Sequence, residues 1–358
     1  MSKGPLLQNR LKSFLLLGQF LQEFLDTSEN PKRSFPKAWY TGLDAIVKGQ
    51  VSFNAWFTED SVLRALKEWS AVLNKSTLDL WLDGYPQLNE SKTKWIAIVM
   101  AGNIPMVGFH DALCVLLSGN NLVMKPSSDD KHLIPYLLHF LEEHSPELKN
   151  CTRIADGKII GFEAVIATGS TNSTRYFQYY FGKYPCLLRK GRTSIALLNG
   201  SESEQDLNGL ADDILAFHGL GCRSVTKLFL PKGFDLDRLF KAIFPFQNIA
   251  NQKAYGDNYD YHRSLFMLNK VKFLENGFFI VREEESLHSP VSVIHYSFYD
   301  NIESAKEEIL LQEESIQLVI GNEIDWFPRK DSFGKAQSPK LNDYADGVDT
   351  MRFLAELK

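Results

Sequence analysis

The stretch KWIAIVMAGNIPMVGFHDALCVLLSGNNLVMKPSS, residues 94–128, decides the fold of this chain. It opens with an apolar run, breaks at AGNIP, continues with helical composition and closes on a second apolar run, NLVMK. Short runs that are apolar throughout are typical of strands buried on both faces of a parallel sheet. The stretch therefore predicts a strand, a crossover helix and a second, parallel strand.

The same alternation continues along the chain. A helix is expected at 129–144, a strand at 163–168 and a helix at 171–182, and a second series of strands and helices begins after residue 201. This pattern predicts an α/β protein with two α/β domains and parallel-type sheets. The expected divisions are a helical N-terminal segment packing on the next domain (1–90), a Rossmann-like domain (91–200), a domain carrying Cys222 (201–335) and a C-terminal tail (336–358).

Composition narrows the function classes. The chain has 358 residues with a formal net charge of −5 and no long run of one sign, so nothing favours nucleic acid or an anionic membrane as a partner. Its four cysteines form no CxxC pair, and its histidines have no spacing suited to a metal site. The first residues predict an amphipathic helix rather than a signal peptide, and no apolar stretch is long enough to span a bilayer. We therefore expect a cytoplasmic protein without a metal centre.

The helical N-terminal segment is rich in aromatic residues. Trp39, Trp56, Trp69 and Trp81 all lie between residues 30 and 84. This region suits either a cap over a substrate site or plain helical packing, and packing is the simpler interpretation.

A single cysteine stands in a glycine-rich turn, AFHGLGCRSV, residues 216–225. Gly219 and Gly221 let the backbone turn sharply and leave the Cys222 sulfur with few side-chain neighbours. That is how a reactive thiol would be presented to a substrate. The alternative is a small buried residue filling a helix-to-strand turn. His218, Arg223, His288 and His295 are candidates to activate the thiol, and structural roles are equally open to the histidines.

Polar residues end three of the predicted strands. Asn103 follows the first strand, Lys125-Pro126-Ser127 ends the second, and Thr168-Gly169-Ser170 ends the third. An asparagine there can donate to a developing oxyanion, a lysine can reach ribose hydroxyls or phosphate, and Gly-Ser at a helix start can bind pyrophosphate. Each also has an ordinary explanation as a turn residue, a solvated lysine or an N-cap, and no GxGxxG fingerprint is present.

Together, the order of these signals resembles the aldehyde dehydrogenase superfamily. The runs GNIPMVGFHDALCVLLSGNNLVMKPSS, GLGCRSVTKLFLP and FGKAQSPKLNDYADG look more closely like the acyl-CoA reductases of the LuxC type, from about Trp95 to the C-terminus. The resemblance implies an aldehyde-dehydrogenase-like fold and an oxidoreductase that forms an aldehyde from an acyl-CoA or acyl carrier protein thioester. It also implies a nicotinamide cofactor, and the superfamily precedent makes a homodimer an expectation.

The resemblance assigns roles residue by residue. Cys222 matches the nucleophile that takes up the acyl group, and Asn103 matches the asparagine that holds the thioester oxygen. Lys125, with Ser127 beside it, matches the adenosine ribose site. The segment beside the pyrophosphate and nicotinamide is matched by Thr168, Gly169 and Ser170. REEESLHSPV resembles the dehydrogenase EExFGPV motif and leaves Glu285 or Ser286 in the place of the glutamate on the nicotinamide ribose.

Two departures from the superfamily pattern refine this interpretation. Oxidising members carry a glutamate that activates water, whereas the matching stretch here, residues 188–192, is LRKGR and has no acid. Many NAD-selective members carry a glutamate three residues after the lysine, and Ser128 stands there instead. We therefore expect NADPH, with NADH as the alternative. The rival functions are an aldehyde dehydrogenase, CoA-acylating or acid-forming, a cysteine acyltransferase or thioesterase, and a non-catalytic binding module.

Overall fold

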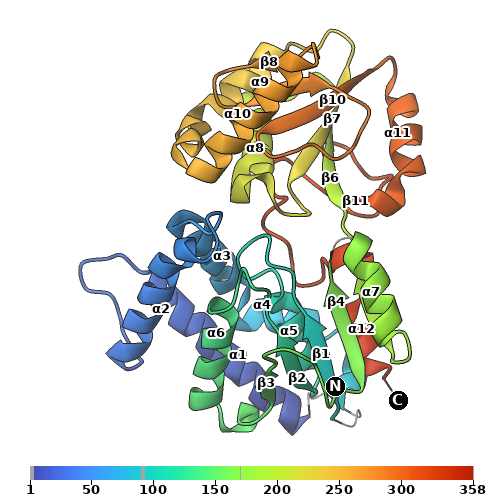
Figure 1. Ribbon diagram of the computed structural model, residues 1–358. Coiled ribbons are helices and arrows are strands. Elements are labelled where there is room, and N and C mark those ends of the chain that lie inside the picture. The colour runs from blue at the N-terminus through green and yellow to red at the C-terminus, as the bar shows by residue number, and fades with distance from the viewer. Residues whose placement is uncertain (1–3, 90–92, 170, 358) are drawn as a thin grey trace. The chain divides into compact units, whose positions relative to one another are not determined.

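A computed structural model describes residues 4–89, 93–169 and 171–357 (Figure 1). The chain divides into two compact units, of which the first comprises Met1–Lys190 with Lys340–Lys358 and the second comprises Gly191–Pro339. Each unit contains its own sheet. The predicted α/β class is confirmed.

The sheet of the first unit is parallel, and its described strands run in the order β3-β2-β1-β4-β5. Side chains alternate between its faces as the pleat requires. Ala97, Val165 and Ala167 share a cluster with Phe177 and Phe181 of the helix on that face, α7. The strands are β1 (Trp95–Val99), β2 (Asn121–Lys125), β3 (Thr152–Ile154), β4 (Ala164–Thr168) and β5 (Cys186–Arg189).

The opposite face of this sheet forms one large core with the N-terminal helices, α5 and α6. Ile96 and Ile98 of β1 belong to this core, and so do Leu341, Met351 and Leu354 of the C-terminal segment. All four tryptophans of the N-terminal segment pack in or against it, so packing accounts for them. The helices of this unit are α1 (Pro5–Leu25), α2 (Lys37–Gly49), α3 (Glu59–Val72), α4 (Lys75–Leu82), α5 (Phe109–Leu117), α6 (Leu133–His144), α7 (Thr171–Phe181) and α12 (Thr350–Ala355).

The second unit is built on a sheet with the order β12-β11-β6-β7-β10-β9-β8, which is parallel except for the pair β8–β9. Its helices are α8 (Glu204–Leu215), α9 (Leu236–Ile243), α10 (Lys253–Leu268) and α11 (Ile302–Leu311). Its strands are β6 (Thr193–Leu197), β7 (Val225–Pro231), β8 (Leu274–Glu275), β9 (Ile280–Glu283), β10 (Val293–Tyr299), β11 (Ile316–Ile320) and β12 (Lys330–Asp331).

The chain passes from one unit to the other at different residues from those that the sequence pattern predicts. The division comes after Lys190 rather than at residue 200, because β6 pairs with β7 and β11 in the second sheet. The predicted tail, 336–358, is shared between the units, since the apolar side chains after Lys340 enter the core of the first one. Within the second unit, β8 and β9 form a hairpin that turns at Gly277, where φ is +94°.

Candidate active site

Cys222 lies half-buried in the turn between α8 and β7. Phe217, His218 and Gly219 precede it with φ values of 51°, 60° and 77°. Glycine adopts this left-handed region readily, but other residues do so at a cost of about 1–3 kcal/mol each. The turn is therefore strained at two non-glycine positions just before the cysteine, and strain of this kind collects at functional sites.

Two serines hold the backbone around the cysteine. The Ser194 hydroxyl donates to the Cys222 carbonyl oxygen at 2.9 Å. The Ser224 hydroxyl oxygen accepts from the Gly221 N–H at 3.2 Å and from the Gln337 amide at 3.3 Å. Both serines are fully buried. The backbone is thus fixed on each side of the sulfur, as a nucleophile needs.

A segment that we call the strap, residues 333–337, packs against this turn within the second unit. Its Gly334 and Ala336 N–H groups donate to the two carboxylate oxygens of Asp213, at 2.7 and 2.9 Å. The Ala336 carbonyl oxygen in turn accepts from Arg223 Nε at 2.5 Å. Asp213 is fully buried on α8, and burial raises the pKa of its carboxyl to about 7. Asp213 therefore holds the strap, and the strap in turn holds Arg223, the residue after Cys222.

The three candidate histidines have different surroundings. His218 is buried in the turn itself, and burial lowers the pKa of its imidazole, which favours the neutral, basic form near pH 7. His295 is buried in β10 with Nδ1 at 2.9 Å from the Ser286 carbonyl oxygen. His288 is exposed. His218 is thus the one that shares a turn with Cys222.

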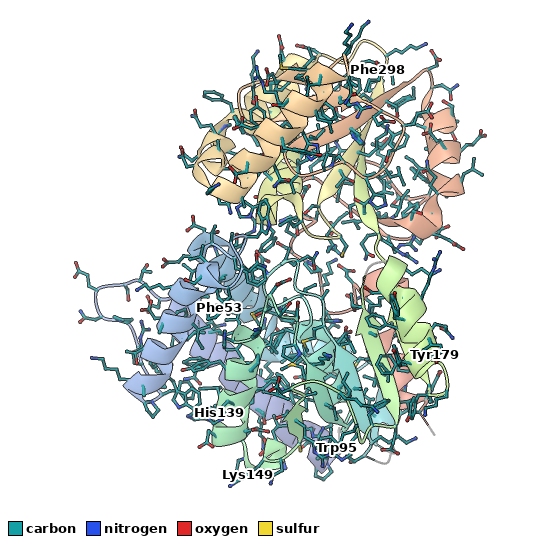
Figure 2. All side chains as sticks on the ribbon, viewed as in Figure 1. Phe53, Trp95, His139, Lys149, Tyr179 and Phe298 are labelled. Carbon is teal, nitrogen blue, oxygen red and sulfur yellow. The ribbon has the colours of Figure 1, made fainter. Side chains whose placement is uncertain are left out.

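The candidate nucleotide residues of the first unit gather at one edge of its sheet. Asn103, Lys125 and Thr168 follow or end β1, β2 and β4, whose carboxyl ends share an edge because the strands are parallel. Figure 2 shows Trp95, the first residue of β1, at the opposite edge. The strand order reverses between β1 and β4, and ligands bind at such a switch point in doubly wound sheets. Ser170 lies outside the described residues.

Two glycines at this edge allow close approaches that a side chain would prevent. A Cβ on Gly102 would lie 2.3 Å from Ser127 Oγ, so the loops after β1 and β2 meet only because this residue is glycine. A Cβ on Gly169 would lie 2.8 Å from the Ser173 Cβ and 2.9 Å from the Phe177 ring. Both glycines are therefore closely packed, and neither position leaves room for a side chain.

The side chains at this edge are at least partly accessible. Asn103 is exposed, and Lys125, Ser127 and Thr168 are half-buried. Lys125 Nζ donates to the Gly157 carbonyl oxygen at 3.0 Å, which holds the ammonium near the end of β2. The structure therefore places these residues together, while their roles stay predictions.

The predicted ribose-binding glutamate is in the second unit, after β9. The Glu284 carboxylate accepts from Arg282 and from the Glu285 N–H, at 2.5 and 3.0 Å. The Ser286 hydroxyl donates to the His288 carbonyl oxygen at 3.3 Å. Glu285 is exposed, and no hydrogen bond within the described ranges engages its carboxylate. Of Glu285 and Ser286, Glu285 is thus the side chain available to a ligand.

The stretch that lacks the water-activating acid ends β5. Arg189, fully buried, pairs with Asp111 at 2.7 Å and donates to Thr350 Oγ1 and to the Ala345 carbonyl oxygen, both at 2.8 Å. This cation therefore anchors the C-terminal segment to the first unit. Its role was not predicted, because the three partners lie far from it in sequence.

Comparison with known proteins identifies the family. A family model described as acyl-CoA reductase (LuxC) matches residues 16–238. The chain belongs to the LuxC acyl-CoA reductase family. The match includes Asn103, Lys125 and the Cys222 turn, and it confirms the resemblance found in the sequence. No curated relative matches the chain.

Solved structures of aldehyde dehydrogenases resemble this LuxC-family protein. Aldehyde dehydrogenase 21 of Physcomitrella patens, in complex with succinate, is 11% identical, with 98% of this chain and 87% of that one covered and a TM-score of 0.62. Glyceraldehyde-3-phosphate dehydrogenase GapN of Methanocaldococcus jannaschii, complexed with NADP, is 12% identical at the same coverages and TM-score. An aldehyde dehydrogenase of Mycobacterium tuberculosis, complexed with NAD+, is 15% identical, with 92% and 77% covered and a TM-score of 0.58. The fold is therefore that of aldehyde dehydrogenases.

No helix within 4–89, 93–169 or 171–357 is long and apolar enough to cross a membrane. In the same ranges, no three His, Cys, Asp or Glu side chains form a group that could hold a metal ion.

Proposed function

We propose that this protein reduces an acyl-CoA thioester to an aldehyde with NADPH, through an acyl group carried on Cys222. The observation that carries the proposal is the strained turn that presents this cysteine in a chain of the LuxC family. An acyl carrier protein thioester is the alternative substrate.

The chemistry begins with the Cys222 thiolate. An unperturbed cysteine has a pKa of about 8.5, so the thiol needs a nearby base or positive charge at neutral pH. His218, neutral and in the same turn, is the base that we assign. The thiolate attacks the thioester carbon, and coenzyme A leaves as its thiol, which yields an acyl-enzyme. The Cys222 N–H would donate to the oxygen that becomes negative, and Asn103 matches the asparagine that has this role in the superfamily; such a donor contributes about 10²–10³ in rate.

Bound NADPH supplies the hydride that reduces the Cys222 thioester. The resulting hemithioacetal on Cys222 then collapses, which releases the aldehyde and regenerates the thiolate. Residues 188–192 offer no acid, and Arg189 in this stretch is buried in its pair with Asp111. We therefore expect water to attack the acyl-enzyme slowly, so that the thioester persists until it is reduced.

The first unit fits a dinucleotide. Its strand order is that of dinucleotide-binding folds, in which the ligand binds at the switch point between the two halves of the sheet. Lys125 and Ser127 would hold the adenosine ribose. By resemblance, Thr168, Gly169 and Ser170 match the superfamily's pyrophosphate segment, and Glu285 matches its glutamate on the nicotinamide ribose.

The choice of NADPH rests on Ser128, which is exposed and carries no charge to repel a 2′-phosphate. Asp129, also exposed, is the next residue and the nearest carboxylate in sequence. Titration of the wild type and of Asp129→Asn with both nucleotides tests the choice. Tighter binding of NADH than of NADPH by the wild type would contradict it.

The proposed reaction is tested by intact-protein mass spectrometry after exposure to a set of acyl-CoAs without a nucleotide. We expect one acyl adduct on the wild type and none on Cys222→Ala, which should still bind NADPH and form no aldehyde. The preferred adduct also reports the chain length. Residual aldehyde formation by Cys222→Ala would refute the role of the cysteine.

The rival functions give different results in the same assays. An acid-forming dehydrogenase would oxidise aldehydes with NAD(P) in the absence of coenzyme A. A thioesterase would release free acid from acyl-CoA in more than stoichiometric amounts. A binding module would leave Cys222 unreactive toward both acyl-CoA and a mild alkylating agent.

A further inference from the structure

Three basic side chains form a row across the sheet of the second unit. His295 of β10 is in register with Lys227 of β7 on one side and with Arg282 of β9 on the other. Laterally paired residues of neighbouring strands point to the same face. Lys227 is 0% exposed and His295 4% exposed, so these two lie inside the unit, whereas Arg282 is half-buried.

Two members of the row hold the loop of residues 284–287, which we call the ribose loop. The Lys227 ammonium donates to the Glu284 carbonyl oxygen. Arg282 Nη2 donates to the Glu284 carboxylate at 2.5 Å. One residue of the loop is thus bound through both its backbone and its side chain.

The rest of the ribose loop is anchored on the same strands. His295 Nδ1 donates to the Ser286 carbonyl oxygen at 2.9 Å, since a carbonyl oxygen can only accept. Thr226 Oγ1 donates to the Leu287 carbonyl oxygen at 2.6 Å. Leu287 itself is buried in the cluster that includes Ile195, so its side chain is fixed as well.

Glu285 differs from the anchored residues of the loop. Its side chain is exposed to solvent and makes no hydrogen bond among the described residues. A loop fixed at the residues before and after one exposed carboxylate presents that carboxylate in a defined place. Positions held in this way reduce the ordering cost of binding a ligand.

Lys227 is a costly residue for its location. Burial disfavours an ammonium, and it lowers the pKa of Lys227 to about 8. A buried charge is retained in proteins only where it is paired or hydrogen-bonded. The bond of Lys227 to the Glu284 carbonyl oxygen therefore accounts for a lysine here.

We propose that Lys227, with Arg282 and His295, is a positioning residue that fixes the ribose loop so that Glu285 meets the nicotinamide ribose. This inference rests on the proposed function for the role of Glu285. The hold of Lys227 on the loop is a property of the protein without nucleotide and can be measured separately.

The test compares Lys227→Met with Lys227→Arg, which keeps a donor, and with Thr226→Val, a milder loss of an anchor on the same loop. Arg329→Met is the matched control, because Arg329 donates to the Glu313 and Ile316 carbonyl oxygens, which lie outside the ribose loop. Hydrogen exchange of the peptide spanning 284–287 is measured without nucleotide. NADPH affinity is measured by fluorescence titration, and acylation of Cys222 by intact mass.

We expect Lys227→Met to speed exchange in the loop and to weaken NADPH binding about tenfold, as for a lost hydrogen bond to a charged group. Thr226→Val should do both to a smaller extent, and Lys227→Arg should restore both. Acylation of Cys222 without nucleotide should be unchanged, and Arg329→Met should match the wild type in the loop and in NADPH affinity.

If the wild type binds NADPH, either of two results would overturn the positioning role of Lys227. One is unchanged exchange of the ribose loop in Lys227→Met, and the other is faster exchange with unchanged NADPH affinity. A wild type that neither binds NADPH nor takes up an acyl group would instead refute the proposed function, and the cofactor role of the loop with it.

Discussion

Replacing Asp213 by asparagine tests how the nucleophile turn is held. The carboxyl is fully buried on α8 and accepts the N–H groups of Gly334 and Ala336 from the strap. Two physical effects compete at this site. Burial favours the neutral acid, whereas two N–H donors favour the carboxylate.

The direction of the pH effect follows from which effect is larger. Burial is the larger one, and it raises the pKa of Asp213 from an ordinary value of 3.8 to about 7. The folded protein then binds the proton more tightly than the unfolded chain. The protonated Asp213 carboxyl therefore makes its full contribution to the free energy of unfolding below about pH 4. This contribution is lost as the pH rises through 7. The whole difference corresponds to about 4 kcal/mol, of which about 2–3 kcal/mol falls between pH 5 and pH 8.

Asparagine is close to the protonated carboxyl in shape and is neutral at every pH. We therefore expect the free energy of unfolding of the wild type, relative to Asp213→Asn, to fall by about 2–3 kcal/mol from pH 5 to pH 8. Urea unfolding read by hydrogen exchange mass spectrometry reports the second unit on its own. The control is Glu204→Gln, an exposed substitution on the same helix, whose difference from the wild type should not change over this range.

The opposite trend would refute this reasoning. If the wild type gained stability over Asp213→Asn as the pH rose, the N–H donors of the strap would outweigh burial, and the carboxylate would be the favoured form. In either case the rate of Cys222 acylation should fall in Asp213→Asn at pH 8, because the amide offers one acceptor where the carboxylate offers two to the strap.

Three further substitutions test other parts of the structure. Gly102→Ala would put its Cβ 2.3 Å from Ser127 Oγ, so NADPH titration should show weaker binding that Ser127→Gly partly restores. Arg189→Met leaves Asp111 buried without its partner and should cost about 3–5 kcal/mol in urea unfolding, more than the double variant with Asp111→Leu. Ser128→Glu should weaken NADPH binding by at least tenfold with little effect on NADH, and equal effects on both would contradict its place near the 2′-phosphate.

Much of the fold could be predicted from residues 94–128, because buried parallel strands produce apolar runs that are visible in the sequence. The strand-end residues could be predicted for the same reason. Once β1, β2 and β4 are parallel neighbours, Asn103, Lys125 and Thr168 must share an edge. The family match confirms the interpretation that their order and the Cys222 turn suggested.

The supports of the candidate site could not be predicted in the same way. Asp213 holds a strap more than a hundred residues later in the chain, and Lys227 holds the carbonyl oxygen of Glu284. For Asp213, the sequence contains one indication that the side chain is buried. Asp213 lies three residues after Leu210, a spacing that puts the two side chains next to each other on α8. Nothing comparable marks the left-handed Phe217 and His218, whose φ values depend on the turn as a whole.

Asp213 and Lys227 both hold a main-chain segment in place, and they carry opposite charges. The carboxylate accepts backbone N–H groups of the strap, and the ammonium donates to a backbone carbonyl oxygen of the ribose loop. Each charge is buried at a cost, and each fixes the main chain next to a residue proposed to touch substrate or cofactor, without itself taking part in chemistry. Substitutions at the two positions should therefore separate. Loss of Asp213 should slow acylation of Cys222 and leave NADPH affinity unchanged, whereas loss of Lys227 should do the reverse.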